Sequence, residues 1–236
     1  MLIGIILAAG NSSRFSKVDS KQFFKLHKRP VLYYSLKAFI DADCFDKIII
    51  VTNKFHFKAA QDLIEMFTET KGSISICEGG SARQTSVYHG VLKAIELNGG
   101  TASKLQIVTH DGARPALPKS IIIENVENIR SGRCVNTVKK VYDTMLYDFG
   151  SGKVDFIDRE KAFAVLTPQS FNALDYIVAY RAVENHIAEY TCVCSVMTAN
   201  GCGMDLIVSD YPIRKITVKS DINAVKQDLK DILSYE

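Results

Sequence analysis

The sequence predicts an α/β fold with a Rossmann-like, doubly wound and mostly parallel sheet, and three observations support this. Short apolar runs such as 3–7 and 47–52 have the continuous hydrophobic pattern of strands buried on both faces. Stretches with helical spacing of apolar residues alternate with these runs. Most runs end in a polar turn, the place where open parallel sheets bind ligands.

The individual elements follow in order along the chain. After the strand at 3–7, we expect helices at 31–40, 57–67, 85–97 and 120–130, and strands at 47–52, 74–77 and 105–109. Right-handed crossovers should connect the parallel strands. Beyond Pro168, the pattern predicts a helix to about residue 188, a second to about 199, strands at 204–208 and 215–218, and a helix from Asp221.

The alternation of strands and helices is interrupted in the middle of the chain. Two β-rich segments flank Gly150, Ser151 and Gly152, which is the pattern of a β-hairpin. We therefore predict a projecting hairpin arm over residues 138–160. At 236 residues, with no low-complexity linker, the chain is expected to form a single domain over 1–236.

Composition restricts the class of partner. The chain has 29 Lys plus Arg against 26 Asp plus Glu, a net charge of +3, so no dominant basic surface suggests a nucleic-acid partner. The apolar start, MLIGIILAA, is too short to span a membrane and lacks the pattern of a secretory signal. We expect a soluble, cytoplasmic protein that binds a small anionic ligand.

Six scattered cysteines are expected to be reduced thiols in such a protein. Cys192, Cys194 and Cys202 could ligate zinc, but no CxxC pair accompanies them. Buried small apolar side chains are the simpler interpretation.

The first candidate ligand loop is LAAGNSSRFSKVDSKQF. Gly10 permits a tight turn, Asn11, Ser12 and Ser13 offer hydrogen-bond donors, and Arg14 and Lys21 add positive charge. The loop matches neither GxGxxG nor GxxxxGK[ST], so the dinucleotide and Walker motifs are absent. It predicts phosphate binding, with an ordinary surface loop as the alternative.

Two further loops follow later strands. In EGGSARQTSVYHG, Gly79 and Gly80 allow close approach of a ligand, and Ser86 lies near a helix start, although a plain turn with a capping serine is equally consistent. In VTHDGARP, Asp111 could hold Mg²⁺ against phosphates and Arg114 could bind an anion, or the two could form a structural pair. We assign no catalytic role to His110.

A fourth group lies in VYDTM, IDREKAFAVLTPQSF and YPIRKIT. Its candidate phosphate contacts are Thr144, Arg159, Thr167 and Lys215. Arg159 ends the hairpin and could reach a neighbouring subunit if the arm is exchanged.

Together these segments, in this order and spacing, resemble the 2-C-methyl-D-erythritol 4-phosphate cytidylyltransferase family and the related ribitol-5-phosphate cytidylyltransferases. The matching pieces are LAAG..SR..S..SKQF, GG.ARQTSV, HDGARP, DTM, DR......LTPQSF and KIT, and they cover nearly the whole chain. The resemblance implies a fold of the nucleotidyltransferase type and transfer of a cytidylyl group from CTP to a polyol phosphate, with release of pyrophosphate.

The resemblance also implies roles for individual residues. Nucleotide contacts are assigned to Ala8, Ala9, Gly10, Gly80, Ser86 and Gly112. Asp111 would bind Mg²⁺, and the acceptor would be held by Thr144, Arg159, Thr167, Arg114 and Lys215. Arg14, Lys21 and Lys215 are assigned to catalysis, the first two stabilising the charge that develops when the acceptor phosphate attacks the α-phosphorus of CTP. The arm would form a homodimer whose sites use both subunits.

Several positions depart from the family pattern. A second glycine is usual where Ser12 stands, a proline at Ser20, an aspartate at Cys192 and an asparagine at Ile213. Because a thiol is a poor substitute for a carboxylate, Cys192 affects either the acceptor end of the site or a helix cap.

Alternatives remain for both the acceptor and the activity. We favour methylerythritol phosphate as acceptor over ribitol 5-phosphate or another polyol phosphate. A weakened paralogue that binds nucleotide as a regulatory or scaffold subunit is a second class of function. An NAD-dependent dehydrogenase would need the glycine fingerprint and an acid where Thr52 and Asn53 follow the second strand.

Overall fold

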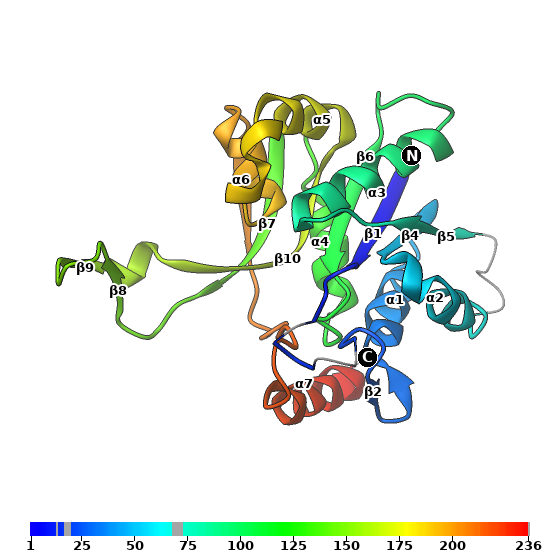
Figure 1. Ribbon diagram of the computed structural model, residues 1–236, viewed down its shortest axis with the longest axis horizontal. Helices are drawn as coiled ribbons and strands as arrows, with labels where there is room; N and C mark the ends of the chain where they lie inside the picture. The colour runs from blue at the N-terminus through cyan, green and yellow to red at the C-terminus, as the bar shows by residue number, and fades with distance from the viewer. Residues whose placement is uncertain (13, 17–19, 68–72, 236) are drawn as a thin grey trace.

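The computed structural model describes residues 1–12, 14–16, 20–67 and 73–235, and a seven-stranded sheet lies at its centre (Figure 1). The strand order is β11-β7-β10-β6-β1-β4-β5. The strands are β1 (Leu2–Ala8), β4 (Lys47–Thr52), β5 (Ile74–Glu78), β6 (Gln106–Asp111), β7 (Arg133–Lys140), β10 (Phe163–Asn172) and β11 (Gly203–Val208).

The sheet is mostly parallel, as predicted. Strand β1 pairs in parallel with β4 and β6, β4 with β5, and β11 with β7, whereas β10 runs antiparallel to both β6 and β7. The parallel neighbours β1, β4, β5 and β6 bring the carboxyl ends of four strands to one edge of the sheet. The polar turns after these strands therefore lie together.

Strand β10 was missed by the sequence analysis, which expected a helix after Pro168. Proline and polar residues hide the strand pattern, and a register shift between Val165 and Gln169 accommodates Pro168. The buried polar side chains have partners inside the protein: Gln169 Nε2 donates to Asn136 Oδ1 at 2.8 Å, and Ser170 Oγ donates to the Asn125 carbonyl at 3.0 Å. The helix begins only at Ala173.

Helices cover both faces of the sheet, which confirms the doubly wound arrangement. Along β1, Leu2 and Ile6 point to one core, and Ile3 and Ile5 to the other. The first core packs against α1 (Val31–Asp41), α2 (Phe57–Ile64) and α4 (Lys119–Glu127). The second packs against α3 (Arg83–Leu97), α5 (Ala173–Ala182) and α6 (Val193–Ala199). The segments η1 (Lys54–His56) and η4 (Glu184–Glu189) are short 3-10 helices.

A third apolar cluster lies beside the sheet and packs against α7 (Asp221–Tyr235). It joins residues from distant parts of the chain: Phe15, Leu26, Val31, Ala116, Ile216, Val225, Leu229 and Ile232. A short hairpin of β2 (Lys25–Leu26) and β3 (Arg29–Pro30) leads into α1. Among the described residues, no helix has the length and apolar character needed to cross a membrane.

The prediction of a strand at 215–218 is wrong. This segment is irregular, because its backbone makes contacts other than a strand ladder. Ile216 N donates to the Ala113 carbonyl at 2.8 Å, and the Asp221 carboxylate accepts from the backbone N–H groups of Thr217 and Val218. The Asp221 side chain and the Ala113 carbonyl thus take the hydrogen bonds that a strand ladder would have used.

The hairpin arm is confirmed. It consists of β8 (Met145–Asp148) and β9 (Val154–Ile157) paired antiparallel, followed by η3 (Arg159–Lys161), and it projects away from the sheet (Figure 1). Its apolar side chains are exposed, Leu146 by 51% and Phe156 by 67%. The single-domain organisation over 1–236 stays a prediction.

Candidate active site

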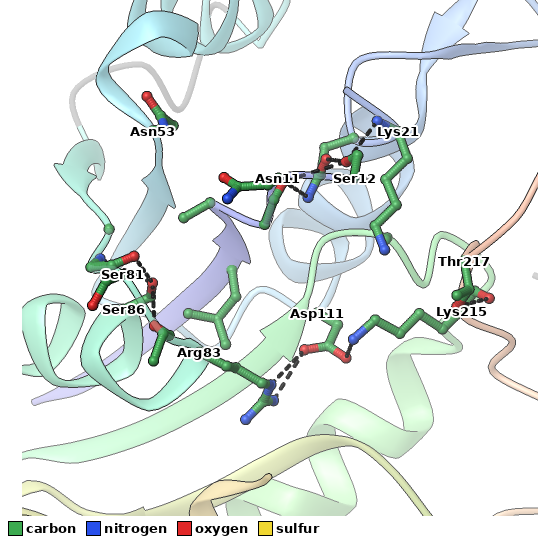
Figure 2. A pocket seen from close by; sticks show the side chains of 18 of the residues that line it. Asn11, Ser12, Lys21, Asn53, Ser81, Arg83, Ser86, Asp111, Lys215 and Thr217 are labelled. Carbon is green, nitrogen blue, oxygen red and sulfur yellow. Dashed lines mark hydrogen bonds and ion pairs between the residues drawn. The ribbon is translucent and has the colours of Figure 1, made fainter. Parts of the chain in front are cut away.

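A cleft of about 580 Å³ opens at the carboxyl ends of the central strands. It is lined by parts of the three predicted loops after β1, β5 and β6, together with residues after β4 and in the segment before α7. Figure 2 shows their side chains around Asp111. The structure therefore brings together segments that are separated by more than two hundred residues in the chain, from Leu7 to Thr217.

The loop after β1 is closed by its own side chains. Ser12 Oγ accepts from the Lys21 backbone N–H at 3.1 Å and donates to Gln22 Oε1 at 3.0 Å. Ser12 has a φ of +55°, a left-handed conformation that favours glycine. Its side chain compensates for that strain by joining the two ends of the loop. Ser13 lies outside the described residues.

The loop after β5 needs its two glycines for close packing. A Cβ on Gly79 would meet the Ala9 Cβ, and one on Gly80 would meet the Thr85 side chain. Gly80 N donates to Ser86 Oγ at 3.0 Å, which fixes the loop against the first turn of α3. No side chain caps the start of α3, so its N-terminal amides are available to a polar ligand group.

Asp111 is the centre of an ion-pair network at the end of β6. Its Oδ1 accepts from Arg83 Nη2 at 3.0 Å, while Oδ2 accepts from Lys215 Nζ at 2.8 Å and lies 3.4 Å from Arg114 Nε. Burial alone would raise the pKa of this carboxyl, but Arg83, Lys215 and Arg114 hold it well below its usual value. Asp111 is therefore a carboxylate at neutral pH.

Lys21 approaches this network from the first loop (Figure 2). It is 9% exposed, and burial together with the nearby Lys215 ammonium lowers its pKa to about 8. The Asp111 carboxylate offsets this effect only in part, so a negatively charged ligand bound beside the two lysines would favour the protonated form of Lys21.

Other predicted residues lie behind the cleft wall. Ala8 is buried, and its carbonyl accepts from Thr52 Oγ1. Gly112 packs against Leu32 and donates its backbone N–H to the Leu7 carbonyl. These contacts position the ends of β1 and β6, and the nucleotide-binding roles assigned to both residues stay predictions.

Two predicted acceptor residues also lie behind Asp111. Arg114 Nη1 donates to the Ile213 carbonyl at 2.7 Å, and Thr167 Oγ1 contacts His110 Nδ1 at 2.9 Å and the Asp111 backbone N–H at 3.2 Å. His110 is fully buried, and burial lowers its pKa to about 4, so the ring is neutral. In this chain Arg114 and Thr167 support the network around Asp111, and their acceptor roles stay predictions.

Thr144 and Arg159 are on the arm, do not line the cleft of their own chain, and are exposed. Cys192 caps helix α6: its Sγ accepts from Ser195 N at 3.3 Å, and Ser195 Oγ accepts from Cys192 N at 3.3 Å. The thiol thus supplies the helix cap that an aspartate could have supplied.

Sequence reasoning missed several residues that line the cleft, among them Asn53, Arg83 and Thr217. Arg83 carried the clearest signal, because it is a cation three residues after the glycine pair, at a predicted helix start. The glycines and the Ser86 hydroxyl of that motif suggest ligand contacts by themselves, whereas the role of Arg83 depends on Asp111, which lies 28 residues further along the chain.

The donor set limits which metal the site can bind. Within the described part of the chain, no group of three or more His, Cys, Asp or Glu side chains could hold a metal ion, so the zinc alternative at Cys192, Cys194 and Cys202 is not supported. One carboxylate facing a cationic cleft fits Mg²⁺ that arrives with substrate phosphates, because this ion commonly uses one or two carboxylates plus phosphate oxygens.

Comparisons with known proteins agree with this geometry. The family model described as 2-C-methyl-D-erythritol 4-phosphate cytidylyltransferase matches residues 2–230. Curated enzymes of that name from Clostridium botulinum and Thermosipho africanus are 30% and 26% identical, covering 97% of this chain and 97% and 98% of their own lengths. The crystal structure of 4-diphosphocytidyl-2C-methyl-D-erythritol synthase from Anaerococcus prevotii shares the fold, with a TM-score of 0.81 at 22% identity over 97% of this chain and 96% of that one.

Proposed function

Because the chain belongs to the 2-C-methyl-D-erythritol 4-phosphate cytidylyltransferase family, we infer that it transfers the cytidylyl group of CTP to 2-C-methyl-D-erythritol 4-phosphate and releases pyrophosphate. One structural observation carries the inference beyond family membership. The glycine loop after β1, the start of α3 and the Asp111 network meet in one cationic cleft.

The charge balance of the cleft suits a triphosphate. Its acidic side chains are Asp111 and Glu78, and its basic ones are Arg14, Lys21, Arg83 and Lys215. The cleft therefore has an excess of positive charge that CTP would neutralise. The depressed pKa of Lys21 is consistent with a site that is electrostatically incomplete until an anion binds.

We assign separate tasks to the ends of the cleft. The loop after β5 and the N-terminus of α3 would hold the cytidine end, with Gly80 and Ser86 close to it. Arg14 and Lys21 would neutralise charge on the phosphates as the acceptor oxygen attacks the α-phosphorus in line with the departing pyrophosphate. Lys215 would orient the acceptor phosphate. Little covalent chemistry by the protein is then required.

We propose that Asp111, together with the phosphates of CTP, would hold Mg²⁺. When bound, the ion would draw charge away from the reacting phosphates. For Asp111 to bind a cation from solution, Lys215 must give up at least part of its contact with Oδ2. Lys215 would then be available to the acceptor.

We also propose that the arm pairs two copies of the chain. Arg159 and Thr144 are exposed and outside the cleft of their own chain, and the arm carries exposed apolar side chains that a second copy would cover. The partner's cleft would then receive these two residues as acceptor contacts. We place the enzyme in the cytoplasm, where its nucleotide substrate is available.

The experiment is a substrate panel. The purified protein is incubated with Mg²⁺, each of the four ribonucleoside triphosphates, and either methylerythritol phosphate, ribitol 5-phosphate or glycerol 3-phosphate, while pyrophosphate is measured. We expect release only with CTP and methylerythritol phosphate. Release with ribitol 5-phosphate alone would reassign the acceptor. Nucleotide binding without release in any combination would support a regulatory paralogue instead.

A further inference from the structure

Arg83 connects the cytidine end of the cleft to the Asp111 carboxylate. It is the first residue of α3 and stands three residues after Gly80, at the end of the loop that follows β5. Both Nη2 and Nε donate to one oxygen, Oδ1 of Asp111, at 3.0 and 3.3 Å. In Figure 2 the guanidinium lies on one side of Asp111 and Lys215 on the other.

The two carboxylate oxygens therefore have different partners. Oδ1 is held by Arg83, whereas Oδ2 is held by Lys215 and lies near Arg114. A carboxylate that lost its Arg83 contact would be free to rotate toward the remaining cations. The plane of the Asp111 carboxylate is thus fixed by Arg83 from the α3 side.

The support for Arg83 is rigid. Its helix is anchored by Val87 and Val91, which are fully buried in the second core. A guanidinium presents its donors in a fixed planar arrangement, whereas a lysine ammonium is a single point charge on a flexible chain. The geometry at Oδ1, with two donors from one side chain, cannot be reproduced by lysine.

We propose that Arg83 is a positioning residue for cytidylyl transfer, which orients the Asp111 carboxylate so that Oδ2 faces Lys215 and the bound phosphates. The proposal rests on the proposed function. It assigns to Arg83 an effect that acts through Asp111, with no direct contact to the reacting atoms. Its position beside the glycine pair means that displacement of the β5–α3 loop would also displace the carboxylate.

A double-mutant cycle tests this assignment. Arg83→Gln, Arg83→Lys and Asp111→Asn are prepared singly, and each Arg83 variant is combined with Asp111→Asn, with kcat, KM for CTP and melting temperature measured for all. We expect Arg83→Gln to lower kcat by roughly 10- to 100-fold, the scale for losing a residue that orients a ligating carboxylate. Arg83→Lys should recover only part of that loss.

The diagnostic result is non-additivity. In the Asp111→Asn background, Arg83→Gln should change kcat by less than about threefold, because its effect is transmitted through the missing carboxylate. Multiplicative losses would overturn the proposal, since they would mean that Arg83 acts independently of Asp111. Lys93→Gln, a half-buried residue later in the same helix that pairs with Glu96, is the matched control and should leave kcat unchanged.

A folding defect is distinguished by melting temperature. If Asp111→Asn does not fold, the result for Arg83→Lys decides. A loss of kcat of about threefold or more at an unchanged melting temperature supports positioning, and a smaller loss overturns it. Failure of the proposed function is a separate result, because the wild-type protein would then release no pyrophosphate from CTP with any acceptor.

Discussion

The cleft and the hairpin arm contrast in how their functional side chains are held. In the cleft, Asp111 is bound by cations from three different segments, and Lys21 is almost fully buried. On the arm, Arg159 is more than half exposed, and its ion pair, at 3.8 Å, is with its neighbour Glu160. In the proposed site, one chain would therefore organise the nucleotide end, whereas the acceptor end would depend on what the arm contacts.

The largest effect is expected from removing a cation at the nucleotide end of the cleft. Lys21→Ala or Arg14→Ala should cost about 3 kcal/mol of transition-state stabilisation, the scale of losing one preorganised donor. Steady-state kinetics of pyrophosphate release would measure it. Lys25→Ala, which changes the exposed residue of β2, is the control. Near-normal turnover in both cleft variants would mean that the β1 loop does not bind the reacting phosphates.

The arm is tested by mixing subunits. Arg159→Ala should weaken binding of the acceptor by about 2 kcal/mol, the scale of one hydrogen bond to a charged group. The loss should appear as a higher KM for the acceptor. Co-expressing Arg159→Ala with Lys21→Ala should restore part of the activity, because a hybrid dimer contains one site with both residues intact. Lys161→Ala, also exposed on the arm, should leave KM unchanged. No recovery in the hybrids would place both residues in the same chain's site.

The pH dependence of CTP affinity tests the role of Lys21 at the nucleotide end of the cleft. With a pKa of about 8, Lys21 is protonated below that pH and loses its charge above it. Because CTP is an anion, its affinity should be greatest below pH 8 and fall by up to about tenfold by pH 9. Calorimetry with a non-hydrolysable CTP analogue would show proton uptake on binding near pH 8. The dependence should largely vanish in Lys21→Arg, and its persistence there would assign it to another group.

The smallest effect is expected at the α6 cap. Cys192→Asp should stabilise the protein by about 0.5–1 kcal/mol, because a carboxylate is a better N-cap than a thiol. Denaturant unfolding would measure this, with Cys202→Ser, beyond the other end of α6, as a comparison that leaves the N-cap unchanged. A change in KM for the acceptor in Cys192→Asp, with unchanged stability, would instead place residue 192 at the substrate.

The sequence predicted the parts of the molecule where local pattern and tertiary contact agree. Apolar runs gave most of the parallel strands, and the polar turns after them led to Gly10, Gly80 and Asp111. Strand β10 was not predicted because its buried polar side chains, Gln169 and Ser170, form hydrogen bonds with residues distant in the chain. No local pattern carries that information.

The same limit applies within the site. Arg114 and Thr167 are residue types that suit phosphate, and their acceptor roles stay predictions, but their hydrogen bonds in this chain run to Ile213 and His110 behind the cleft. Conversely, Arg83 looked like part of a turn motif until its distance to Asp111 was known. Residue type indicates what a side chain could bind, whereas the competing partners that decide its role are visible only in three dimensions.

The third apolar cluster has a consequence for heat inactivation. Phe15 is the neighbour of Arg14 and Ile216 the neighbour of Lys215, and both belong to the apolar cluster that includes Val225 and Leu229 of α7. Partial undocking of that helix on warming would loosen two of the cleft's cations at once while the two larger cores stayed intact. Catalysis would then fail several degrees before the far-ultraviolet dichroism signal does.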